Sequence, residues 1–122
     1  MTQRAQEIRR AQKESLLLRE ISKLYLDLCI DKPELQSLFV NRVQLSSDKS
    51  GCNVFFFSTQ GEEKFKELFP TLILYKPSMR KAIAHSIPSR RAPDLVFKYD
   101  YPYEKQQQVE LALNTLKYED EK

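Results

Sequence analysis

The sequence has 122 residues, 41% of them hydrophobic, and a net charge of +3. A chain of this length is expected to form one domain that buries roughly 65% of its unfolded surface, so its core requires neither a metal ion nor a disulfide. The two cysteines, Cys29 and Cys52, have no other thiol or histidine at metal-ligand spacing, and we interpret both as small buried hydrophobic residues in a reducing compartment. No apolar run follows Arg4, Arg9 and Arg10, which argues against a signal peptide or a membrane-spanning helix and predicts a cytoplasmic protein.

Residues 3–28 carry the pattern of a long amphipathic helix. Five apolar residues recur there at helical spacing, namely Leu17, Ile21, Leu24, Tyr25 and Leu28. About 26 residues at 1.5 Å each give a helix of roughly 40 Å, so its first turns are expected to project beyond the domain or to fray. Pro33 ends the pattern, and we expect Asp31 and Glu34 to cap a short turn before the next element.

The next two segments predict a β-hairpin. Residues 39–46 (FVNRVQLS) and 52–58 (CNVFFFS) are rich in β-branched and aromatic residues and flank the turn sequence SDKSG, in which Gly51 is expected to adopt a positive φ. The second strand has apolar residues on both faces, which predicts a central position in the sheet. Its run of Phe55, Phe56 and Phe57 is typical of core packing, which we favour over an exposed platform for stacking RNA bases because two helices need that sheet face.

Residues 62–87 predict two helices with a kink between them. Phe65, Leu68 and Phe69 have helical spacing until Pro70 interrupts the pattern, which residues 71–75 resume, so this part forms two pieces or a kinked helix. A further helix begins at Pro77 and cannot pass Pro88. It has one apolar face, made by Met79, Ala82, Ile83 and Ile87.

The C-terminal part predicts one more strand and a weaker helix. Leu95, Phe97 and Tyr99 alternate with polar or exposed positions, and residues 104–116 have helical spacing. Near the strand end, Tyr99, Tyr101 and Tyr103 either stack on a base or pack under the last helix. The order is helix, strand, strand, helix, helix, strand, with an accessory C-terminal helix. This order predicts an α+β two-layer sandwich with helices on one face of a three-stranded sheet.

Basic residues concentrate between positions 76 and 100. Six basic residues stand there against two acidic ones, a net charge of +4, so the rest of the chain is close to neutral. The candidate RNA-binding residues are Lys76, Arg80, Lys81, Arg90 and Arg91, with Arg9, Arg10, Arg42 and Lys49 as outlying contributors. Such a patch recognises folded RNA by phosphate positions and shape. The alternative is that these are solvated charges on an ordinary surface.

The sequence offers no combination of residues for catalysis. No carboxylate pair, nucleophile with a base, metal-ligand set or phosphate loop has workable spacing, so we predict no catalytic residue, metal, cofactor or small-molecule substrate. The single histidine, His85, falls on the polar side of its helix without a catalytic partner. The only glycines, Gly51 and Gly61, lie outside the region between the two helices, so a GxxG loop that could clamp single-stranded nucleic acid between them is absent.

The predicted order of elements is the type II K-homology topology, and three segments resemble the ribosome-binding factor A family. They are the hairpin VQLSSDKSGCNVFFFS, the helix SMRKAIAHSI with its Met79-Arg80 pair, and RRAPDLVFKYD, and together the resemblance extends over about residues 4–100. Two departures stand out. The sequence Tyr75-Lys76-Pro77 replaces the usual Ala-x-Gly kink, and Asp94 replaces a glutamate.

The resemblance implies a monomeric, non-enzymatic assembly factor. Such a factor binds the free small (30S) ribosomal subunit or its precursor and promotes late maturation and processing of 16S ribosomal RNA, with a role in cold adaptation. It further implies a K-homology-like RNA-binding domain over residues 1–103, followed by a C-terminal helix and flexible tail over 104–122. The alternative is a protein-binding module in which the exposed strand edge or the long first helix binds a partner and the basic loop is incidental.

Overall fold

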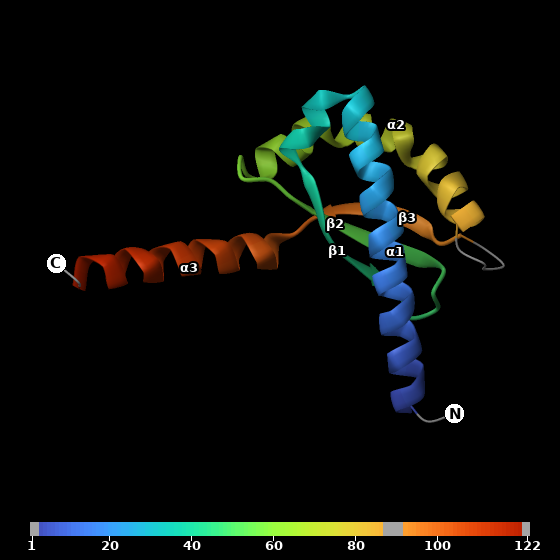
Figure 1. Ribbon diagram of the computed structural model, residues 1–122, viewed down its shortest axis with the longest axis horizontal. Helices are drawn as coiled ribbons and strands as arrows, with labels where there is room; N and C mark the ends of the chain where they lie inside the picture. The colour runs from blue at the N-terminus through green and yellow to red at the C-terminus, as the bar shows by residue number, and fades with distance from the viewer. Residues whose placement is uncertain (1–2, 87–91, 121–122) are drawn as a thin grey trace.

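The computed structural model describes residues 3–86 and 92–120 of the chain. Its elements are α1 (Gln3–Asp31), the short 3-10 helix η1 (Pro33–Ser37), β1 (Phe39–Leu45), β2 (Gly51–Phe57), α2 (Glu62–Ser86), β3 (Asp94–Tyr99) and α3 (Tyr101–Asp120). Figure 1 shows α1 and α2 packed against the sheet and α3 extending away from it. The predicted α+β sandwich of type II K-homology topology is confirmed.

The sheet has the strand order β1-β2-β3, as the two-sided apolar pattern of the central strand predicted. β1 pairs antiparallel with β2, and β2 pairs parallel with β3. Val54 therefore lies between Val43 and Phe97, and Gly51 lies beside Asp94. The parallel pairing places the start of β2 and the start of β3 at the same end of the sheet.

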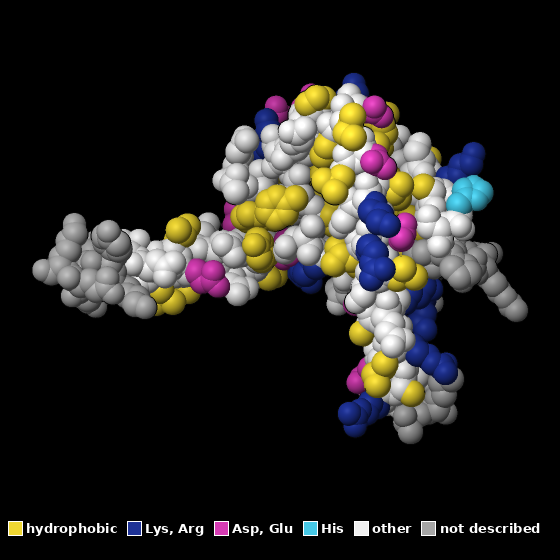
Figure 2. All heavy atoms as spheres, viewed as in Figure 1, with side chains coloured by type: hydrophobic (Ala, Val, Ile, Leu, Met, Phe, Trp, Pro, Cys, Tyr) yellow, Lys and Arg dark blue, Asp and Glu magenta, His cyan; other side chains and the backbone are white. Residues whose placement is uncertain are grey.

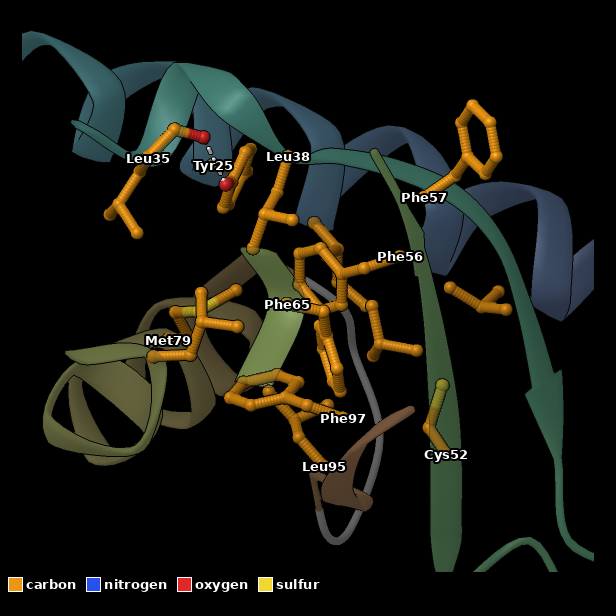
Figure 3. Close-up of a cluster of buried hydrophobic side chains, with 14 of the residues drawn as sticks. Tyr25, Leu35, Leu38, Cys52, Phe56, Phe57, Phe65, Met79, Leu95 and Phe97 are labelled. Atoms are coloured by element: carbon orange, nitrogen blue, oxygen red, sulfur yellow. Dashed lines mark hydrogen bonds between the residues drawn. The ribbon is translucent and has the colours of Figure 1, made fainter. Parts of the chain in front are cut away.

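The core lies between one face of the sheet and the helices α1 and α2. Phe56 is fully buried at its centre, and its ring contacts those of Tyr25, Phe97 and Phe65 at centroid distances of 5.4, 5.5 and 6.0 Å (Figure 3). Phe57 points away from this cluster in Figure 3, because neighbouring residues of a strand face opposite sides. Core packing is thus confirmed for Phe56 and for Phe57, which is also buried and packs on the rings of Tyr99 and Tyr103. Phe55 is half-buried on the face opposite Phe56. The predicted burial of both cysteines is also confirmed.

α2 is one helix where two were predicted. It runs without a break from Glu62 to Ser86 with Pro70 and Pro77 inside it, and Figure 1 shows that it changes direction along its length. The two prolines are seven residues apart, so they share one helix face, and both are exposed. Each deprives a carbonyl one turn earlier of its amide donor, but a carbonyl on the solvent side can bind water instead. Prolines on the outer face therefore bend α2 around the core without ending it.

The hairpin turn corrects the expectation for Gly51. The residue with positive φ is Lys49, at 62°, whereas Gly51 is the first residue of β2. A carboxylate oxygen of Asp48 organises the turn, since it accepts hydrogen bonds from the Ser46 and Ser50 hydroxyls at 2.7 Å and the Ser50 amide at 3.0 Å. These bonds, from Ser50 first and then Ser46, lower the pKa of Asp48 to about 2. The turn is therefore fixed by side-chain hydrogen bonds.

A hydrogen bond inside the core, and not the predicted caps, links the end of α1 to η1. α1 continues to Asp31, and η1 has Lys32 as its N-cap without a side-chain hydrogen bond, so the capping roles expected for Asp31 and Glu34 are wrong. The Tyr25 hydroxyl donates instead to the carbonyl of the fully buried Leu35. This bond ties η1 to α1 from inside the core.

α3 begins at Tyr101, three residues before the predicted start. Asp100 precedes it and accepts a hydrogen bond from the Tyr103 amide at 3.2 Å, which is the role of an N-cap. Pro102 fits the first turn because an amide there needs no partner within the helix. From Gln108 to Thr115 every side chain of α3 is exposed.

Candidate nucleic-acid interface

Basic side chains from several elements lie at one end of the sheet, where β1 ends and β2 and β3 begin. We call this region the basic end. The Asp94 amide donates to the Ser50 carbonyl at 2.9 Å, so the start of β3 touches the hairpin turn. The first turns of α1 and the second half of α2 reach the same end through the bonds described next.

The first turns of α1 are attached to the hairpin through Arg10. Its guanidinium donates to the Leu45 carbonyl at 2.9 Å and to the Ser46 carbonyl, and it pairs with Glu14 at 3.5 Å. Glu14 in turn accepts from the Leu45 amide at 3.2 Å. These bonds hold a helix whose first turns project beyond the sheet, as predicted (Figure 1).

Arg9, Arg10 and Lys49 line one hollow of about 420 Å³ between α1 and the hairpin turn. Its other lining residues are Gln3, Gln6, Glu7 and Ser47. Lys49 and Arg9 are exposed, whereas Arg10 is half-buried. The structure thus gathers three of the outlying basic residues into one polar surface. Figure 2 shows Lys and Arg side chains collected on and beside the lower half of α1.

The second half of α2 supplies the rest of the basic end. The Lys76 ammonium lies 3.6 Å from a carboxylate oxygen of Asp94, and the Arg80 guanidinium donates a long hydrogen bond of 3.5 Å to the Ala92 carbonyl. Lys81 is exposed on the same helix. The predicted residues Arg90 and Arg91 lie outside the described residues.

Arg42 does not join this group. It lies towards the other end of the sheet, where Nε donates to Asp100 Oδ2 at 2.8 Å and Nη2 donates to Oδ1 at 3.1 Å. Its guanidinium carbon sits 3.8 Å from the centroid of the Phe55 ring. Burial favours a raised pKa for Asp100, but hydrogen bonds from Arg42, Asn41 and the Tyr103 amide outweigh it and hold that pKa below its usual value.

The tyrosines near the end of β3 divide between packing and exposure. Tyr99 is buried, and burial with a contribution from Glu104 raises its pKa to about 12. Tyr103 packs edge-on against Phe57 at a centroid distance of 4.8 Å. Tyr101 is 54% exposed and donates a hydrogen bond to Glu62. Packing therefore explains two of the three rings and leaves Tyr101 at the surface.

A second hollow, of about 550 Å³, lies beside the end of β3 and was missed by the sequence analysis. Arg42, Phe55, Lys98 and Tyr101 are among its lining residues, together with Lys66 and Phe69 from α2. The signal was present in part, because Lys98 falls on the outward side of a predicted strand. What the sequence could not show is that positions from five separate elements meet there.

Residues 9–113 match the family model described as ribosome-binding factor A, which is most of the chain. The chain belongs to the ribosome-binding factor A family. The resemblance recognised in the sequence is thereby confirmed, and the descriptions of similar proteins agree with it.

Two relatives and one solved structure document the family relationship. The ribosome-binding factor A of Prochlorococcus marinus strain MIT 9301 is 33% identical over 111 residues, which cover 89% of this chain and 85% of the relative. That of Prochlorococcus marinus subsp. pastoris is 35% identical over 105 residues, 84% of this chain and 79% of the relative. The crystal structure of ribosome-binding factor A from Thermus thermophilus superimposes with a TM-score of 0.64 at 28% identity and covers 74% of this chain and 93% of its own.

Neither a candidate membrane-spanning helix nor a candidate metal-binding cluster occurs in the described part of the chain. No helix in it is long and apolar enough to cross a membrane. Within the same residues, no group of three or more His, Cys, Asp or Glu side chains is placed to hold a metal ion. His85 is exposed on α2, as predicted.

Proposed function

We propose that the protein binds the free small (30S) ribosomal subunit or its precursor and promotes late maturation and processing of 16S ribosomal RNA, with a role in growth at low temperature. Membership of the ribosome-binding factor A family over residues 9–113 is the observation that carries this proposal. The basic end supports it, because contacts bring cations of α1, the hairpin turn and α2 to one end of the sheet. We assign the binding to residues 1–103 and to a monomer in the cytoplasm.

The mechanism requires no covalent chemistry. Cations fixed at the ends of α1, α2 and the hairpin can contact phosphates whose spacing depends on how the RNA is folded. A protein that binds one RNA conformation more tightly than another shifts the population towards it by that difference in affinity. The protein would therefore stabilise the mature arrangement of a mobile RNA junction.

Co-sedimentation tests the proposal. The purified protein is centrifuged with free small subunits, free large subunits and complete ribosomes, each at two salt concentrations. We expect migration with free small subunits only and loss of binding at the higher salt, because released counterions drive phosphate binding. Protein that stays at the top of every gradient would refute the proposal. Binding that is insensitive to salt would favour the protein-binding alternative.

A charge-matched pair of variants makes the test specific. The variant Lys49→Gln, Arg80→Gln, Lys81→Gln removes three exposed cations from the basic end. The control Arg19→Gln, Lys23→Gln, Lys105→Gln removes three exposed cations elsewhere. We expect the first variant to lower the salt slope by about two to three, roughly one for each lost phosphate contact, and the control to retain it. Equal effects would mean that net charge, and not the basic end, determines affinity.

A further inference from the structure

The hollow beside the end of β3 is separate from the basic end. It lies between the first half of α2, the last residues of β3 and the first turn of α3. Lys98, which lines it, is four residues along β3 from Asp94 at the basic end, a distance of about 13 Å. A ligand in this hollow would therefore add to the contacts at the basic end without competing with them.

Aromatic rings form most of its walls. Phe55 and Phe69 are half-buried, and Tyr101 is exposed at its edge. Ring faces of this kind stack on nucleic-acid bases with little regard to sequence, because every base has a π-face. The volume of about 550 Å³ lies within the range of small-ligand sites.

Cations surround this aromatic wall. Arg42, Lys66 and Lys98 line the hollow, and Glu62 is the only acidic residue among those lining it. Glu62 already pairs with Lys66 at 3.5 Å and accepts a hydrogen bond from Tyr101. Within residues 3–86 and 92–120, the Lys98 ammonium has no ion-pair partner. The hollow thus presents an uncompensated positive charge beside an aromatic surface.

Arg42 provides a fixed planar surface. Its two hydrogen bonds to the fully buried Asp100 set the orientation of the guanidinium, and one side of that plane lies over Phe55. The Arg42 side chain is nevertheless 42% exposed. A flat group can therefore stack on the outer side of the guanidinium and extend a stack that already exists in the free protein.

We propose that this hollow, the β3 pocket, binds one unpaired nucleotide of RNA. Its base stacks on the Arg42 guanidinium above Phe55, with Phe69 and Tyr101 on the apolar side, and its phosphate faces Lys98. The proposal rests on the proposed function, since it supposes that the partner is RNA. A nucleotide satisfies the planar stack and the unpaired cation together, which a purely apolar segment of a protein would not.

A short RNA tests the proposal on the full-length protein. The probe is a six-nucleotide single-stranded RNA with one central 2-aminopurine, a base whose fluorescence is quenched when it stacks. Phe55→Leu keeps an apolar side chain but removes the ring that supports Arg42, and we expect it to weaken binding about tenfold. Lys98→Gln removes an exposed cation without an ion-pair partner, and we expect a loss of about three- to tenfold with a smaller salt slope.

Two controls keep the outcome clear. Lys105→Gln removes an exposed cation from α3, outside the pocket, and is expected to leave both affinity and quenching unchanged. Thermal unfolding of Phe55→Leu shows whether it folds, and Lys98→Gln tests the pocket even if it does not. Absence of quenching by the wild-type protein at low salt would overturn the proposal. Unchanged affinity in Lys98→Gln together with unchanged affinity in a folded Phe55→Leu would overturn it equally.

The outcome is distinguishable from that of the proposed function. If wild-type protein binds small subunits but the hexanucleotide shows no quenching, the pocket is not a nucleotide site and the function stands. If the protein binds no ribosomal particle but quenches the probe through Phe55 and Lys98, the pocket stands and the function fails.

Discussion

Replacing Asp100 by Asn tests the central electrostatic contact of the structure. Asp100 is fully buried and holds Arg42 through two hydrogen bonds, Asn41 through one at 2.9 Å, and the start of α3 through the Tyr103 amide. Asn retains the size of Asp and is an equally good N-cap, so the cap should survive. The substitution removes the negative charge and leaves one acceptor oxygen where Arg42 and Asn41 now use two.

The magnitude follows from the exposure of Arg42. Removing one partner of a fully buried ion pair costs about 3–5 kcal/mol. Because 42% of the Arg42 side chain is exposed, water can replace part of what the guanidinium loses. We therefore expect the free energy of unfolding to fall by about 2 kcal/mol at pH 7. This corresponds to a decrease in melting temperature of roughly 5–10 °C for a chain of this size.

The effect should depend on pH in one direction. The folded protein holds the pKa of Asp100 below its unfolded value, so the stabilisation is fully present above the unfolded pKa of about 4 and is lost as the pH falls through the folded pKa. The difference between wild type and Asp100→Asn should then be constant from pH 8 to about pH 5 and shrink below about pH 4.

Urea denaturation followed by far-UV circular dichroism measures this difference at each pH. Asp27→Asn makes the same chemical change at an exposed position of α1 and is expected to alter stability by less than about 0.5 kcal/mol. A loss for Asp100→Asn no larger than that of the control, or one that grows towards acidic pH, would refute the assignment of Asp100 as an ionised anchor for Arg42.

Two further predictions concern the turn and the thiols. Lys49→Gly should raise the free energy of unfolding, measured by urea denaturation, by about 0.5 kcal/mol. The reason is that glycine relieves the strain of a positive φ of 62°, and this gain exceeds the added entropy of the unfolded chain. The control Lys81→Gly, inside α2, should lower the free energy of unfolding by about 1 kcal/mol. A loss of stability in Lys49→Gly would contradict this account of the turn. Burial raises the pKa of Cys52 to about 11, so a thiol reagent at pH 8 should label Cys52 about a hundredfold more slowly in the native protein than in the urea-unfolded protein. Burial also raises the pKa of Cys29, which should likewise react more slowly in the native protein. Rapid native labelling would show that the thiols are accessible.

Patterns within a single element predicted the fold well. The alternation of Leu95, Phe97 and Tyr99 places β3 within one residue of its observed start, since the period of two follows directly from strand geometry. The same holds for the hairpin strands. Prolines misled the interpretation of α2, because a proline breaks a helix only where its lost hydrogen bond or its bend conflicts with packing, and Pro70 and Pro77 face solvent.

Contacts between distant elements could not be predicted. Arg42 and Asp100 are 58 residues apart, and nothing in either segment identifies the other as its partner. The sequence therefore indicates that Arg42 belongs to the basic patch, whereas the structure places it over Phe55 beside a different hollow. The hairpin turn shows the same limit at short range, because Lys49 and not the glycine takes the positive φ, in a turn that also contains the hydrogen bonds of Asp48.

A net charge of +3 does not by itself distinguish an RNA-binding patch from an ordinary charged surface. The arrangement of charges at the basic end argues for the RNA-binding patch. Acidic residues also occur there: Glu7 lines the hollow beside Lys49, and three others take part in internal contacts. Asp48 is occupied by the turn, Asp94 pairs with Lys76, and Glu14 pairs with Arg10. Lys49 and Lys81 remain exposed without an ion-pair partner in the part of the chain that the structure describes. An anion approaching this end therefore meets Lys49 and Lys81, whose charges no ion pair neutralises within the described residues, and this favours phosphate binding.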